Sequence, residues 1–335
     1  MARLDVLEGV QVVEYGDHHA AAVTAYHLGL AGADVVLVEP PEGCALRQHP
    51  SLFAFAGRGR RLVTLADHLV QHRPAPDVLL RPAYPTPELE ANIARRRVDS
   101  DWQRTLLVDF QESDGTQLTE LTAQAECGIT AFLGRAGAPP RRVGYEMISH
   151  SAGMLAAQAV VAALMQRGEG RGQSIRVPMS RAAAAILNNV TTASVAPEQP
   201  THFSQGWSHD PSTGVVAADG AFEILFYGTA NVTGWVAFCA SIGAETLAID
   251  PRFDTHAKRL DHPADLSRAL EPWTRQRPRA ELIDLVRAAG GTAMPKHTIT
   301  QAAAWEQTQA NGMIDAHSGL PAAPWVLNGV RAATT

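Results

Sequence analysis

The chain has 335 residues, of which 46% are hydrophobic and 19% charged, and its formal net charge is −6. This composition is typical of a folded protein with about two domains of ~150 residues each, and it is unlike that of a disordered chain. The negative charge and the lack of a dense Lys/Arg run exclude nucleic acid as a partner. No membrane span is predicted, because the sequence contains no run of about 18 consecutive apolar residues. We expect a cytoplasmic protein, because the first residues lack a signal-peptide layout and the three cysteines are widely spaced.

The first part of the chain alternates between apolar strands and a helix. Residues 9–14 predict a strand, residues 20–30 a helix that ends near Gly32, and residues 34–39 a second strand stopped by two prolines. A strand–helix–strand unit of this kind predicts a parallel sheet. Three more short apolar runs extend it, at 62–65, 77–80 and 105–110. The succession predicts an α/β fold class with a Rossmann-like open sheet.

The most helical stretch is 152–166, which is apolar nearly all round and is therefore predicted to be buried. Three glycines end it, and residues 174–177 predict the next strand. Residues 194–214 are rich in Ser, Thr, Pro, Gly and His and predict a long connection.

After this connection the pattern restarts with a turn at Asp219–Gly220. Three helices are predicted near 233–243, 263–274 and 279–289, which indicates a second, smaller α+β domain. The predicted organisation is a large Rossmann-like domain over 1–200, a linker and small domain over 201–305, and a C-terminal segment over 306–335 that returns to the large domain.

Three common kinds of site are not supported. Glu39 stands where a ribose-binding acid would end the second strand, but the glycine fingerprint of dinucleotide binding is missing from the preceding turn, residues 15–20. The histidines have no metal-ligand spacing, so no metal is expected. Ser149 followed by His150 lacks the glycines of a hydrolase nucleophile elbow.

A short basic turn, residues 57–61 (GRGRR), precedes the predicted strand at 62–65. One interpretation is anion binding, because guanidinium groups fork onto phosphates. The other is a solvated loop. Three arginines in four residues between apolar runs leave both interpretations open.

Several stretches together resemble the class III CoA-transferases, the CaiB/BaiF family that also contains the α-methylacyl-CoA racemases. No single motif decides the resemblance, but the order and spacing of the stretches hold from about residue 7 to 314. The stretches that carry it are 7–13, 32–41, the basic turn 57–61, 123–128, 168–173, 219–220 and 250–253.

The resemblance implies a Rossmann-like large domain, a small domain and a homodimer of two interlocked ring-like subunits. It implies an acyl-CoA transferase or, less directly, a racemase-like isomerase. CoA or an acyl-CoA would be a bound substrate rather than a covalently held cofactor. Its phosphates would lie near the basic turn, so the resemblance assigns phosphate contacts to Arg58 and Arg60.

The usual nucleophile of the family is missing. Family members attack the thioester with an aspartate four residues before the glycine of the long helix, and counting back from Gly153 gives Ser149. The histidine that works with this aspartate in the racemases corresponds to Thr119, which Glu120 follows. Both racemase groups are therefore replaced.

The sequence leaves several roles open around this position. Ser149 or Ser151 could cap the helix, and Glu146, the nearest carboxylate in sequence, could reach the pocket if the preceding loop shifted. His150 is not expected to activate Ser149, because adjacent side chains diverge at a helix start. Free N–H groups at the helix start are expected to bind an anion or a carbonyl even without the aspartate.

Two hypotheses of different kinds follow. The first is an enzyme of the family that binds a CoA thioester and carries out altered transfer chemistry. The second is a non-catalytic binding or scaffold subunit, paired with a homologue that has the aspartate. A third, weaker hypothesis is conventional transfer or racemisation through a carboxylate such as Glu146.

Overall fold

A computed structural model defines the fold over most of the chain. The residues that it describes are 5–16, 18–40, 42–48, 50, 53–54, 57–65, 75–81, 86–99, 102–132, 139–168, 170–187, 214–226, 231–315, 319, 321–324, 326–327 and 330–331. The predicted connection 194–214 lies outside these residues except for Gly214. The chain divides into two compact units: unit 1 is Met1–Leu133, Pro140–Trp207 and Gly312–Thr335, and unit 2 is Gly134–Pro139 and Ser208–Asn311.

Unit 1 is built on a six-stranded sheet in which every neighbouring pair is parallel. The strand order is β3-β2-β1-β4-β5-β6. The strands are β1 (Gln11–Tyr15), β2 (Asp34–Glu39), β3 (Arg60–Thr64), β4 (Val78–Leu80), β5 (Leu106–Asp109) and β6 (Ser174–Arg176). The predicted α/β fold with an open parallel sheet is confirmed.

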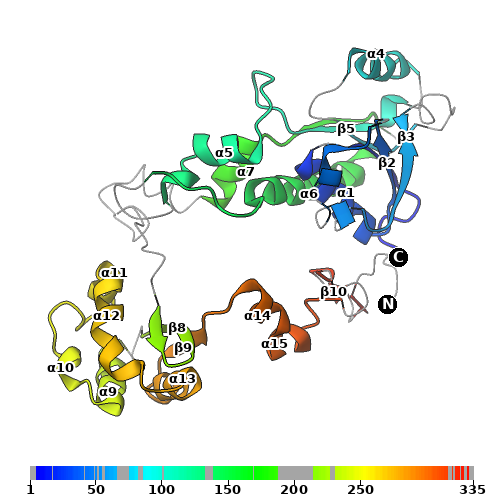
Figure 1. Ribbon diagram of the computed structural model, residues 1–335. Helices are drawn as coiled ribbons and strands as arrows, with labels where there is room; N and C mark the ends of the chain where they lie inside the picture. The colour runs from blue at the N-terminus through cyan, green and yellow to red at the C-terminus, as the bar shows by residue number, and fades with distance from the viewer. Residues whose placement is uncertain are drawn as a thin grey trace. The chain divides into compact units, whose positions relative to one another are not determined.

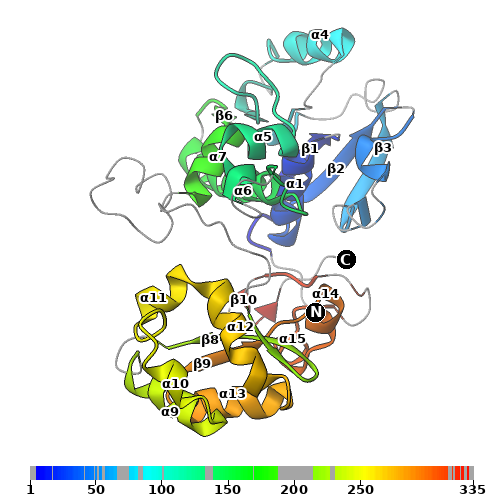
Figure 2. The same cartoon turned by 60° about the vertical axis from the view of Figure 1, so that its left-hand side comes forward.

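Helices cover both faces of this sheet, which is why its central strands are apolar on both sides. Val12 and Val78 face the cluster that contains α1 and α6, whereas Val13 and Leu79 face α4. Figures 1 and 2 show α1 and α6 side by side on one face. The helices of unit 1 are α1 (His19–Leu30), η1 (Ala45–Gln48), α4 (Pro87–Arg96), η2 (Trp102–Arg104), α5 (Glu120–Glu126), η3 (Ile129–Phe132), α6 (Met147–Arg167) and α7 (Met179–Ile186). A C-terminal pair of short strands, β10 (Val326–Leu327) and β11 (Val330–Arg331), also belongs to unit 1.

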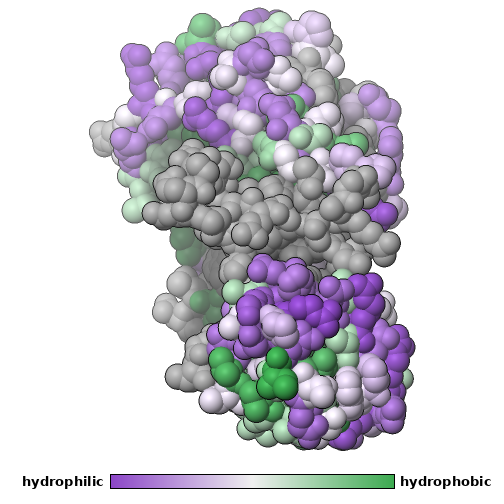
Figure 3. Space-filling view, turned by 90° about the vertical axis from the view of Figure 1, so that its left-hand side faces the viewer, coloured by the Kyte–Doolittle hydropathy of each residue, from purple (hydrophilic) through white to green (hydrophobic). Residues whose placement is uncertain are grey.

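Helix α6 begins at Met147, five residues before the predicted start at 152. By length and hydropathy it could cross a membrane, but half of the apolar window is buried within the fold. On the face drawn in Figure 3, hydrophilic side chains predominate and hydrophobic ones form small separate areas. The apolar sequence of α6 is therefore explained by its packing in the core of unit 1.

Unit 2 has a three-stranded antiparallel sheet covered by helices. Its core is rich in aromatic residues and includes Phe253 of the 250–253 stretch, which follows a turn held by hydrogen bonds from Arg252 to Asp250. The small α+β domain is confirmed. Its elements are β7 (Val215–Ala217), β8 (Gly220–Leu225), α9 (Thr233–Ile242), α10 (Glu245–Ala248), α11 (His256–Asp261), α12 (Pro263–Thr274), α13 (Arg279–Ala288), β9 (Thr292–Pro295), α14 (Ile299–Ala304) and α15 (Glu306–Ala310).

Helices α1 and α6 approach closely at Gly153. A Cβ atom at this glycine would lie 2.6 Å from both the Ala20 carbonyl oxygen and the Val23 Cβ. The Thr24 hydroxyl donates to the Gly153 carbonyl oxygen at 3.1 Å and to the Ala20 carbonyl oxygen at 2.8 Å. The absence of a side chain at Gly153 thus allows the N-terminal halves of the two helices to lie together.

Replacing this glycine tests the packing. We expect Gly153→Ala to lower the free energy of unfolding by about 2 kcal/mol, because overpacking outweighs the better helix propensity of alanine. The measurement is urea unfolding followed by circular dichroism. Gly144→Ala is the control, since nothing lies within 4 Å of a Cβ added there. Equal stability of the two variants would contradict the close packing.

Candidate active site

The candidate site lies at the start of α6, where α5 also begins. Thr119 caps α5: its hydroxyl accepts from the Thr122 N–H, and the Thr122 hydroxyl accepts from the Thr119 N–H. Thr119, which the resemblance aligned with the racemase histidine, is therefore a helix cap. This cap places Glu120 in the first turn of α5.

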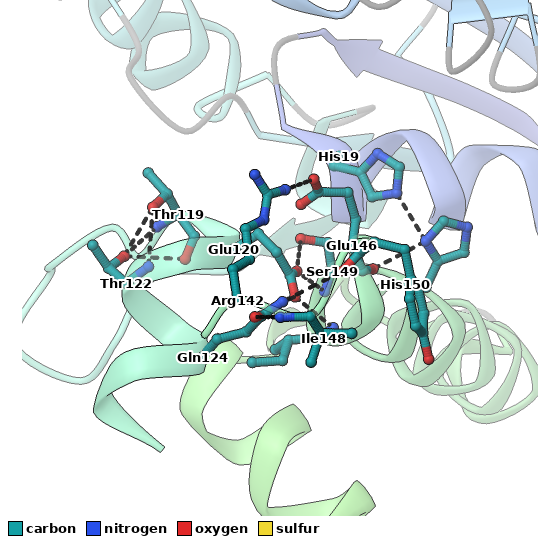
Figure 4. Close-up of polar contacts among 12 residues, drawn as sticks. His19, Thr119, Glu120, Thr122, Gln124, Arg142, Glu146, Ile148, Ser149 and His150 are labelled. Carbon is teal, nitrogen blue, oxygen red and sulfur yellow. Dashed lines mark hydrogen bonds and ion pairs between the residues drawn. The ribbon is translucent and has the colours of Figure 1, made fainter. Parts of the chain in front are cut away.

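The Glu120 carboxylate occupies the start of α6 (Figure 4). Its Oε1 accepts from the Ile148 N–H at 3.1 Å and from the Gln124 side-chain amide at 2.7 Å. Its Oε2 accepts from the Ser149 N–H at 2.8 Å and from the Ser149 hydroxyl at 2.7 Å. Glu120 is 8% exposed and Ser149 3% exposed. A buried carboxylate with four donors is well suited to the positive end of a helix.

The expected free N–H groups at this helix start are not found, and that prediction was wrong. Glu120 accepts from Ile148 and Ser149, the Met147 N–H donates to the Tyr145 carbonyl oxygen, and the His150 N–H donates to the Glu146 carbonyl oxygen. The first-turn donors therefore already have acceptors. The helix start already holds an anion, and this anion is supplied by the protein itself.

The capping role predicted for Ser149 or Ser151 is also wrong. The helix starts earlier than predicted, so both serines lie inside it. The Ser149 hydroxyl donates to Glu120, and the Ser151 hydroxyl donates to the Met147 carbonyl oxygen at 2.8 Å. The residue at the cap position is Glu146, whose side chain makes no capping hydrogen bond.

Glu146 is turned toward another partner. Its carboxylate forms an ion pair with Arg142, and both side chains are partly exposed. His150 lies within hydrogen-bonding distance of His19, with 2.9 Å between Nδ1 and the His19 Nε2, and 3.1 Å from the Glu146 carbonyl oxygen. Figure 4 shows these two pairs beside the Glu120–Ser149 pair.

The sheet topology gives a reason for this location. Strand β1 pairs with β2 on one side and with β4 on the other, which is the position where ligands bind at the carboxyl ends of open α/β sheets. Helix α1 starts there, and the His19–His150 contact brings the start of α6 next to it. His18 stacks on Phe110 with 5.0 Å between ring centroids, and burial lowers the pKa of His18 to about 4. His18 is therefore neutral at pH 7.

A similar carboxylate–serine contact occurs at the start of α7. Glu112 accepts from the Ser180 N–H at 3.0 Å and from the Ser180 hydroxyl. This contact is only partly buried. At the starts of both α6 and α7, a glutamate thus accepts from the backbone N–H and the hydroxyl of a first-turn serine.

The two arginines predicted to bind phosphate lie in different surroundings. Arg58 donates to the Pro321 carbonyl oxygen at 2.8 Å, and its guanidinium carbon lies 5.5 Å from the centre of the Tyr26 ring. Arg60 forms an ion pair with Glu14 at 2.5 Å, and these side chains are 2% and 0% exposed. Arg60 also donates to the Ala22 carbonyl oxygen. A phosphate contact from Arg60 would therefore require this buried pair to separate.

Comparisons with known proteins agree with the fold. The family model described as CoA-transferase family III matches residues 7–73 and 114–332. The chain belongs to this family. The match contains Ser149, Glu120 and the basic turn. It establishes membership of a family of transferases that act on CoA thioesters.

Individual relatives are distant. The chain is 24% identical over 332 residues to a probable fatty acyl-CoA transferase of Mycobacterium tuberculosis, covering 88% of this chain and 83% of that protein. It is 28% identical over 195 residues to an acyl-CoA transferase of Fusarium pseudograminearum, covering 57% of this chain but only 42% of that one. A crystal structure of a CaiB/BaiF family protein from Brucella suis superposes with a TM-score of 0.83 at 22% identity, covering 99% and 95% of the two chains. That likeness shows the fold.

Sequence reasoning identified Ser149 but did not give Glu120 a role in the site. The available signal was the carboxylate of Glu120, which directly follows Thr119, the residue that the resemblance aligned with the racemase histidine. The pairing itself depends on contacts between residues that are 28 and 29 positions apart.

The buried Arg60–Glu14 pair gives a prediction about stability. We expect Arg60→Ala to lower the free energy of unfolding by about 3 to 5 kcal/mol, because the change leaves the Glu14 carboxylate buried without its charge partner. Urea unfolding is the measurement. The exposed neighbour Arg61 provides the control, and Arg61→Ala is expected to change stability by at most about 0.5 kcal/mol. Similar losses in both variants would argue against a buried pair.

The four hydrogen bonds of Glu120 give a second prediction. Glu120→Ala leaves the Ile148 and Ser149 N–H groups buried without acceptors, and we expect it to lower the free energy of unfolding by about 3 kcal/mol. Glu112→Ala removes the matching contact at α7, where water can replace the carboxylate, and is expected to cost about 1 kcal/mol. Both values come from chemical denaturation. If Glu112→Ala lowered the free energy of unfolding as much as Glu120→Ala does, the difference in burial between the two contacts would be contradicted.

Proposed function

We propose that the protein binds a CoA thioester and acts on its acyl group as an altered member of CoA-transferase family III. The observation that carries the proposal is the Glu120 carboxylate bound to Ser149 at the start of α6. The residue at the nucleophile position has changed, but a carboxylate still stands within hydrogen-bonding distance of it. Relatives named as acyl-CoA transferases support the reaction class.

Arg58 is the proposed phosphate contact. It lies in the basic turn before β3, its side chain is partly exposed, and its contact with Pro321 uses a neutral carbonyl oxygen that a phosphate could replace as acceptor. Arg60 is proposed to support the turn by pairing with Glu14 of β1 and by donating to the Ala22 carbonyl oxygen of α1. Any phosphate contact of Arg60 would be secondary to that role.

A cytoplasmic, interlocked homodimer is the proposed form of the protein, as the family resemblance implies. The second candidate function is a non-catalytic binding or scaffold subunit, paired with a homologue that has the aspartate. The saturation of Glu120 by four donors favours this alternative, because a carboxylate held in this way stabilises a helix whether or not it reacts. Turnover by the purified protein alone separates the two candidates.

Calorimetric titration with CoA and with acetyl-CoA tests the proposal. We expect saturable binding that Arg58→Ala weakens about tenfold, because a charge-assisted hydrogen bond contributes about 1.5 to 3 kcal/mol. Arg61→Ala is the matched control from the same turn and should leave the affinity unchanged. Absence of binding in the unmodified protein would remove the proposed function.

A further inference from the structure

The contact between Ser149 and Glu120 has the geometry of a nucleophile and its base. The Ser149 Oγ donates to Glu120 Oε2 at 2.7 Å, within the range over which a base accepts a proton from a reacting hydroxyl. The base is held in turn by the Gln124 amide at 2.7 Å and by two backbone N–H groups. A hydroxyl, a base and a group that orients the base are the three parts of an activated serine.

We propose that Ser149 accepts the acyl group of a CoA thioester with Glu120 as its general base, so that the protein forms an acyl-serine ester. This inference rests on the proposed binding of a CoA thioester. It differs from aspartate chemistry in its intermediate, because a serine hydroxyl gives an ester and not a mixed anhydride. The overall activity is hydrolysis of the thioester, or transfer to another hydroxyl, rather than exchange of CoA between carboxylates.

The acylation step balances within these groups. Ser149 Oγ bonds to the thioester carbonyl carbon, and its proton moves to Glu120 Oε2. The carbon–sulfur bond then breaks, and the CoA thiolate takes the proton from Glu120, which leaves free CoA thiol, an ester on Ser149 and the original carboxylate. In the second step Glu120 accepts a proton from water, the water oxygen bonds to the ester carbonyl carbon, and the proton returns to Ser149 as the acid departs.

The helix supports this chemistry electrostatically. Negative charge would develop next to the first turn of α6, near the positive end of the helix dipole. Because the first-turn N–H groups already have acceptors, this support comes from the dipole and not from free donors. The second step is expected to be slower than the first, because an ester is less reactive than the thioester from which it forms. The acyl-serine ester should therefore accumulate.

Access to Ser149 requires the site to open, since Ser149 and Glu120 are both buried. Residues 139–146 form the segment that leads into α6, and most of their side chains are exposed. Gln124 binds this segment by accepting from the Val143 N–H and donating to the Tyr145 carbonyl oxygen. Displacement of this segment by a thioester would break these two hydrogen bonds and leave the Glu120–Ser149 pair in place.

The experiment uses the full chain, incubated with excess acetyl-CoA and, separately, octanoyl-CoA. Intact-protein mass spectrometry should show one added acyl group per chain, with release of CoA thiol, and peptide mapping should place the group on Ser149. Neutral hydroxylamine distinguishes the adducts, because it cleaves an anhydride or a thioester and leaves a serine ester intact.

Variants assign the roles of the two side chains. Ser149→Ala should abolish the adduct, and Glu120→Gln should slow its formation about a hundredfold, the typical effect of losing a general base. Ser180→Ala is the matched control, because Ser180 makes the same kind of contact with Glu112, and it should leave acylation unchanged. Ser149→Cys keeps a nucleophile at the position and should give an adduct that hydroxylamine removes.

Any of four results would overturn the inference. An adduct that maps to Glu120 and is labile to hydroxylamine would make the carboxylate the nucleophile. Equal acylation of Ser149→Ala and the unmodified protein would exclude Ser149. No adduct on the unmodified protein, together with saturable CoA binding by calorimetry, would refute the ester while the proposed function stands. Failure of both acylation and binding would remove the proposed function as well.

Discussion

A single carboxylate joins α5 to α6, and the arrangement of the site depends on it. Helix α6 lies in the core of unit 1, so the N–H groups of its first turn cannot all be left to water. Glu120 accepts from two of them and from the Ser149 hydroxyl. The same contacts hold α5 against the helix start. The carboxylate that stabilises the core is therefore also the charged group next to Ser149.

The packing of α1 on α6 determines what lies near that charge. Gly153 lets the helix backbones approach, and Thr24 hydrogen-bonds across the contact. As a result the starts of both helices meet, and His19 reaches His150 at the carboxyl ends of the sheet strands. The close packing of two core helices thus also positions His19 and His150 beside the candidate site. A substitution that changes the packing is therefore expected to change the site as well.

The sequence predicted the sheet well because its central strands β1, β2, β4 and β5 are short apolar runs buried on both faces, a pattern that can be recognised locally in the sequence. It did not predict the start of α6, because Ser149 and Ser151 resemble capping residues. The acceptor for the Ile148 and Ser149 N–H groups is Glu120, which is distant in sequence. Arg60 was equally hard to interpret: in sequence it belongs to a basic turn, but its partner Glu14 is 46 residues away. Local patterns carry no information about such pairings.

Ser149 and Glu120 are best understood as a single hydrogen-bonded unit. An aspartate at position 149 would place a second carboxylate beside Glu120, where Ser149 now donates a hydrogen bond at 2.7 Å in a buried site. Two carboxylates at such a distance cannot both stay ionised, so one would have to bind a proton. A hydroxyl removes this conflict by acting as a donor. The carboxylate on α5 therefore favours a donor on α6, and the helix start presents a hydroxyl next to a carboxylate.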